Sequence, residues 1–192
     1  MTKKTLNQNA KYDQRFLDVV EPEFEFSNKP INRLKIVLED SVQNKTEKED
    51  LEAKTFCGDV GLLLNKMLLA IKIKREKVYS TYSINFRPPN DRKPTTQEIR
   101  RYSIFIKEHI SIIDPKILIL MGTTAMEAVT GLGNQISNER GNWKEIIIGN
   151  KTIPVIITFN PSYLIRYPDK KKFSWEDLKK IRKKVEDLNI KI

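Results

Sequence analysis

A proline-rich cationic turn carries the clearest binding chemistry in this chain. It follows an apolar run, precedes a helical pattern, and holds Arg87, Arg92 and Lys93 among three prolines. Guanidinium and ammonium groups donate hydrogen bonds to phosphate oxygens. Proline fixes the backbone angle φ, so the turn presents these charges on a stiff backbone. The pattern predicts contact with a polyanion.

The charge of the whole chain agrees with that prediction. Its 192 residues carry a formal net charge of +10, and the excess is confined to residues 71–101 (net +6) and 166–192 (net +5). The segment 39–54 is acidic, so a DNA-facing surface is expected to avoid it. The single cysteine, Cys57, excludes an internal disulfide and any site built from several thiolates.

The elements that must position the turn are visible as apolar patterns. Short runs at 34–38, 78–84, 117–121 and 153–158 predict strands, and the last two are continuous enough to be buried on both faces. Apolar residues spaced three and four apart predict helices over 61–73, 96–113 and 175–188. Alternating strands and helices predict an α/β domain with a mainly parallel sheet.

The domain is expected to span residues 31–192 and to follow an extension over 1–30, which shows weak patterning. No apolar run reaches the roughly 18 residues of a membrane span. We therefore expect a cytoplasmic protein without membrane contact. The net positive charge points to a polyanion such as DNA as the partner. We also expect a monomer with no metal site and no cofactor.

Four further segments flank the cationic turn, one before it and three after it, and their order along the chain is informative. They are Phe56-Cys57-Gly58-Asp59-Val60-Gly61, Pro115-Lys116-Ile117-Leu118-Ile119-Leu120-Met121-Gly122, Arg140-Gly141-Asn142-Trp143 and Phe159-Asn160-Pro161-Ser162-Tyr163-Leu164-Ile165-Arg166. Together with the turn they resemble the family 4 uracil-DNA glycosylases over about residues 34–188. The resemblance implies a three-layer α/β/α sandwich with a central four-stranded parallel sheet. It also implies active-site loops at the carboxyl ends of the strands.

The resemblance also implies catalytic positions, and several of them are altered. The acid that positions water corresponds to Glu39, with Asp40 beside it, but the glycines and proline of the family's loop are missing. Phe56 matches the aromatic platform for the flipped base. Tyr82 stands where the family has the asparagine that reads uracil, and Asn160 stands where it has a histidine. A tyrosine lacks the paired donor and acceptor of an amide, whereas Asn160 still donates one neutral hydrogen bond.

The DNA contacts implied by the resemblance are better preserved. Ser162 is expected to bond a phosphate and Leu164 to wedge into the base stack. The predicted DNA-binding set is Arg87, Arg92, Lys93, Ser162, Tyr163, Leu164 and Arg166. The family's iron–sulfur cluster needs four cysteines, and the two ligand positions that can be matched in this chain are Phe86 and Tyr102. We expect these aromatic side chains to fill the volume of the cluster.

Three functions follow as alternatives. The favoured one is a divergent uracil-DNA glycosylase-like protein that binds DNA, is linked to base-excision repair, and has lost or greatly weakened uracil excision. The second is an active glycosylase for uracil or another damaged base, using Glu39 or Asp40 for water and Asn160 for the base. The third is a non-catalytic interaction scaffold in DNA repair or replication that uses its lysine-rich C-terminal helix.

Overall fold

The computed structural model describes residues 36–39, 58–84, 88 and 92–190. The predicted extension over 1–30 lies outside these residues. The strands are β1 (Ile36–Glu39), β2 (Tyr79–Tyr82), β3 (Leu118–Met121), β4 (Trp143–Ile148) and β5 (Lys151–Thr158). The helices are α3 (Gly58–Ala70), η1 (Arg75–Lys77), α4 (Thr96–Ile113), α5 (Thr123–Thr130), α6 (Ile136–Glu139), α7 (Pro161–Arg166), η3 (Pro168–Lys170) and α8 (Lys171–Asp187).

The strands form one sheet in the order β2-β1-β3-β5-β4. Neighbouring strands from β2 to β5 are parallel, and β4 pairs with β5 in antiparallel fashion. The described sheet is therefore mixed and has five strands, in contrast to the predicted sheet of four parallel strands. The difference arises because residues 143–158 form a hairpin whose turn contains Gly149, with a φ of 59°. A short turn of this kind connects antiparallel strands without a crossover helix.

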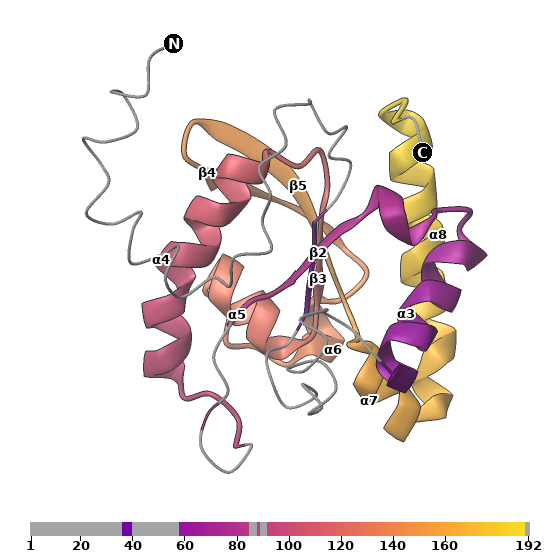
Figure 1. Cartoon of the computed structure of the whole chain (residues 1–192), viewed down its shortest axis with the longest axis horizontal. Helices are drawn as coiled ribbons and strands as arrows, with labels where there is room; N and C mark the ends of the chain where they lie inside the picture. Colours follow the sequence, from indigo (N-terminus) through magenta and orange to yellow (C-terminus); the bar gives the residue numbers. More distant parts are fainter. Residues whose placement is uncertain (1–35, 40–57, 85–87, 89–91, 191–192) are drawn as a thin grey trace. The chain divides into compact units, whose positions relative to one another are not determined.

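Helices cover both faces of the sheet (Figure 1). Helices α3 and α8 pack with Ile119, Met121 and Ile156 in one core, whereas α4 and α5 pack with Leu118 and Leu120 in the other. Successive side chains of β3 thus alternate between the two cores, as the pleat of a strand requires. The α/β class and its layers of helix, sheet and helix follow from this alternation.

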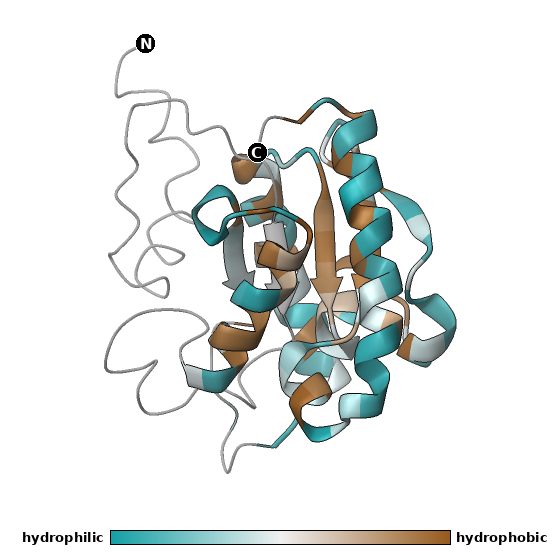
Figure 2. Cartoon of the chain, turned by 90° about the vertical axis from the view of Figure 1, so that its right-hand side faces the viewer, coloured by the Kyte–Doolittle hydropathy of each residue, from teal (hydrophilic) through white to brown (hydrophobic). Residues whose placement is uncertain are grey.

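The helices are amphipathic, and their ribbons in Figure 2 show hydrophilic and hydrophobic bands along the same element. Helix α4 occupies the predicted range, because its apolar residues Ile99, Ile106, Ile110 and Ile113 recur on one face and are buried. Its N-cap is Thr95, because Thr95 and Glu98 form a reciprocal capping box. Within the described part of the chain, no helix is long and apolar enough to cross a membrane.

Candidate active site

The register of the parallel strands brings three of the predicted positions to one edge of the sheet. Glu39 is paired with Tyr82 on one side and with Met121 on the other, and Met121 is paired with Thr158. These are the last residues of β1, β2, β3 and β5, and Asn160 follows two residues after Thr158. The carboxyl edge of a parallel sheet is where α/β proteins place their ligands. Asp40 and Phe56 lie outside the described residues.

Tyr82 is buried at this edge, with 3% of its surface exposed. Its side chain belongs to the core between the sheet and helices α3 and α8, together with Met121, Phe159 and Leu164. A tyrosine at the end of β2 therefore occupies interior volume beside the candidate site. Space taken by its ring is not available to another aromatic ring, because protein interiors are close-packed.

Asn160 caps the N-terminus of α7 with its side chain. Its Oδ1 accepts hydrogen bonds from the backbone N–H and the Oγ–H of Ser162, both at 2.8 Å. A backbone N–H is a donor only, so the amide oxygen must face it and the orientation of the amide is determined. The amide nitrogen Nδ2 is then the group of Asn160 that is left to donate to a ligand.

The residues of α7 that follow Asn160 lie partly in the interior and partly on the surface. Ser162 is buried and donates its hydroxyl to Asn160, and its expected bond to a phosphate stays a prediction. Leu164 has 1% of its surface exposed and packs in the core, because it lies on the inner face of α7. In this position the side chain is inside the core, and the role of Leu164 as a wedge stays a prediction. Ile165 and Arg166 are the exposed residues of α7, and Tyr163 is half-buried.

A buried ion pair, which was not predicted from the sequence, stabilises the connection of Phe159 and Asn160 between β5 and α7, here called the Asn160 loop. Arg140 donates from Nε to Oδ2 of Asp177 at 3.1 Å and from a terminal nitrogen to Oδ1 at 2.5 Å. Thr158, the last residue of β5, donates its hydroxyl to the same carboxylate at 2.7 Å. The guanidinium of Arg140 also lies over the ring of Phe159 at 5.3 Å. The residues on the N-terminal side of Asn160 are thus tied to helix α8.

Gly141 allows the Asp177 carboxylate to lie close to the backbone beside Arg140. Its φ is 73°, and a Cβ at this position would overlap the Asp177 carboxylate. Lys180 donates to the Gly141 carbonyl at 2.6 Å. Burial raises the pKa of the Asp177 carboxyl, while the hydrogen bonds from Thr158 and Arg140 act in the opposite direction. The Arg-Gly pair in the quoted motif was the available sequence signal, but its partner lies 37 residues away.

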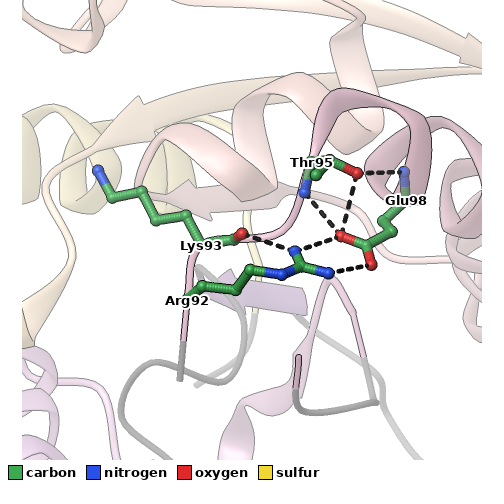
Figure 3. Close-up of polar contacts among 4 residues, drawn as sticks. All are labelled: Arg92, Lys93, Thr95 and Glu98. Atoms are coloured by element: carbon green, nitrogen blue, oxygen red, sulfur yellow. Dashed lines mark hydrogen bonds and ion pairs between the residues drawn. The ribbon is translucent and has the colours of Figure 1, made fainter. Parts of the chain in front are cut away.

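Within the cationic turn, Arg92 pairs with Glu98 of α4. Arg92 donates to both carboxylate oxygens of Glu98, at 2.8 and 2.7 Å, and to the Lys93 carbonyl at 3.0 Å. Its guanidinium is therefore engaged at the N-terminus of α4, with 43% of the side-chain surface exposed, and its assignment as a DNA-binding residue stays a prediction. Figure 3 shows that the side chain of Lys93 extends away from this pair. Lys93 is exposed, and Arg87 lies outside the described residues.

The ion pair between Arg92 and Glu98 predicts that the stability of the protein depends on pH. The hydrogen bond from Arg92, reinforced by the backbone N–H of Thr95, lowers the pKa of Glu98 from 4.5 to about 2. A carboxyl whose pKa is lowered by folding stabilises the native state above pH 4.5, and that contribution is lost as the pH falls from 4.5 towards 2. We expect the midpoint of thermal unfolding to fall less steeply over this range in Glu98→Gln than in the parent. Glu108→Gln, on the exposed face of α4, is the control. Equal slopes in the parent and Glu98→Gln would contradict the prediction.

The residues present do not fit an iron–sulfur cluster. The whole chain contains one cysteine, and a cluster of the family 4 type takes four thiolates. Tyr102, at one matched ligand position, is half-buried against the core beneath α4, with its ring centroid 6.1 Å from that of Phe105. Phe86, at the other, lies outside the described residues. Packing of Phe86 against Tyr102 stays a prediction.

Comparisons with known proteins assign the chain to a family. The family model of the Uracil DNA glycosylase superfamily matches residues 43–182. A type-4 uracil-DNA glycosylase of Thermotoga maritima is 39% identical over 121 residues, which are 62% of this chain and 62% of that protein. The type-4 enzyme of Archaeoglobus fulgidus is 31% identical over 69% of each chain. That of Sulfurisphaera tokodaii is 34% identical over 71% of this chain and 64% of its own length. The chain therefore belongs to the uracil-DNA glycosylase superfamily, as a divergent family 4-like member that lacks the iron–sulfur cysteines.

Proposed function

We propose that this protein binds DNA in a role linked to base-excision repair, and that its uracil excision is lost or greatly weakened. The observation that carries the proposal is the burial of Tyr82 at the carboxyl edge of the sheet, in register with Glu39. The family resemblance puts a uracil-reading asparagine at this position. A buried phenol ring does not offer the paired donor and acceptor that an amide offers to a pyrimidine edge.

The basic residues around this edge support the DNA-binding part of the proposal. Lys93 and Arg166 are exposed, one before α4 and the other at the end of α7. Each phosphate contact to duplex DNA contributes about −0.9 to the slope of log K against log salt. If both residues contact phosphates, removing them will flatten the slope.

We therefore expect Lys93→Ala/Arg166→Ala to bind a short duplex more weakly at low salt, with a slope that is less negative by about 2. The measurement is fluorescence anisotropy at several salt concentrations. The matched control is Lys116→Ala/Lys151→Ala, which removes the same charge from the opposite edge of the sheet, because Lys116 precedes β3 and Lys151 is the first residue of β5. If the two double variants flatten the slope equally, the DNA does not lie on the proposed face.

A second candidate function is residual excision of uracil or of another damaged base. The orientation of Asn160 favours it, because the cap leaves Nδ2 as a donor at the carboxyl edge of the sheet. A gel assay with a panel of damaged bases tests this alternative. Release of any base that is abolished by Asn160→Ala, while DNA binding is retained, would support it over the first proposal.

A further inference from the structure

A stack of aromatic rings leads from the Asn160 loop to the surface. The centroids of Phe159 and Tyr163 are 5.1 Å apart with an interplanar angle of 29°, and those of Tyr163 and Tyr167 are 4.7 Å apart at 38°. Phe159 is buried, whereas Tyr167 has 50% of its surface exposed. The stack therefore begins beside the candidate site and ends in an exposed ring at the end of α7.

A second exposed ring, Phe173, lies among cations near the start of α8. The Nζ atoms of Lys170 and Lys172 are 5.9 and 5.1 Å from its centroid, and the guanidinium of Arg140 is 5.3 Å away. Phe173 has 38% of its surface exposed. The aromatic–basic surface is defined by Arg166, Tyr167, Lys170, Lys171, Lys172 and Phe173. The single acid within this sequence range, Asp169, is paired with Lys170 at 2.9 Å.

We propose that the aromatic–basic surface binds single-stranded DNA, and this rests on the proposed DNA-binding function. Cations that track a backbone, combined with exposed rings on which bases stack, are what sites for single strands require. A duplex keeps its bases stacked and paired inside, so exposed rings gain little from it. The surface begins directly after α7, whose N-cap is Asn160. A strand that passes the candidate site would continue over Tyr167 and Phe173.

The combination of cations and exposed aromatic rings favours single-stranded DNA over an acidic protein as the partner. An acidic peptide would be attracted by Arg166 and the lysines, but it does not need two exposed rings. The rings add an interaction that is independent of sequence, because every base has a π-face. A probe of unstacked thymidines should therefore depend on the rings and the cations together.

The test compares labelled oligothymidine of about 15 nucleotides with a duplex of similar length, by fluorescence anisotropy on the full chain. The variant Tyr167→Leu/Phe173→Leu keeps apolar bulk and removes both rings. We expect its affinity for the single strand to fall by about 10- to 100-fold, with a change of less than about 3-fold for the duplex. The control is Phe105→Leu, which removes a ring that is also 38% exposed but lies on α4, at the opposite face of the sheet. Thermal unfolding verifies that each variant is folded.

The outcomes separate the two proposals. If the parent binds neither probe, the proposed DNA-binding function is wrong. If the parent binds both probes and the double variant binds each of them as tightly as the parent does, only the assignment of the aromatic–basic surface is overturned. A loss of equal size for both probes would mean that bases do not stack on these rings. Displacement of the oligothymidine by polyglutamate at matched charge, as effective as displacement by unlabelled oligothymidine, would favour an acidic protein partner.

Discussion

No detectable release of uracil is expected when the purified protein is incubated with uracil-containing DNA, single- or double-stranded. Two defects lead to this expectation. Tyr82 places a buried ring where the family resemblance implies the amide that reads uracil. Asn160 offers a neutral donor where it implies a histidine, and loss of one matched donor to a developing anion costs roughly 10² to 10³ in rate. Together the two defects place the rate roughly 10⁴-fold or more below that of a competent enzyme. The measurement is strand cleavage at abasic sites on a denaturing gel.

The double variant Tyr82→Asn/Asn160→His tests whether these side chains are the whole cause. We expect it to remain inactive, because the glycines and proline of the family's loop are also absent around Glu39. Its folding needs a separate check, since a histidine at position 160 removes the oxygen that caps α7 at a cost of about 1 kcal/mol. Uracil excision by the unmodified protein at a normal glycosylase rate would overturn the proposal. Activity of the double variant alone would show that the loop around Glu39 is competent.

The second large effect concerns stability. Arg140→Ala is expected to lower the free energy of unfolding by about 3–5 kcal/mol, because it leaves the buried Asp177 carboxylate without its charged partner. The exposed fractions of the two side chains are 15% for Arg140 and 1% for Asp177. Chemical denaturation measures the change. Lys151→Ala removes an exposed ion pair with Asp114 and should cost about 0–1 kcal/mol.

A double-mutant cycle checks the origin of this loss. Arg140→Ala/Asp177→Ala should be less destabilising than the sum of the two single variants, because neither charge is then buried alone. A loss below about 1 kcal/mol in Arg140→Ala would contradict a buried, ionised pair. The same variant should also loosen the Asn160 loop, since Arg140 contacts Phe159 and its partner carboxylate holds Thr158.

Periodicity in the sequence was sufficient for the main elements. Helix α4 was predicted over its observed range, and the predicted strand at 117–121 contains β3, because a buried face requires apolar residues at regular spacing. Strand β4 was missed, although Gly149-Asn150 between two apolar runs is a hairpin signal. It is an edge strand whose residues are mostly exposed or half-buried, so its apolar pattern is weaker.

The residue types at the candidate site, the excess of positive charge and the shortage of cysteines can all be read from the amino-acid sequence. The contacts of the side chains depend on how the folded elements pack. Leu164 turns inward because α7 packs its inner face on the core, and Arg92 is paired because the chain folds back to the start of α4. Arg140 meets Asp177 across 37 positions of sequence. Such contacts depend on how separate elements pack. Local sequence patterns predict helices and strands, but they do not predict which distant residues come into contact.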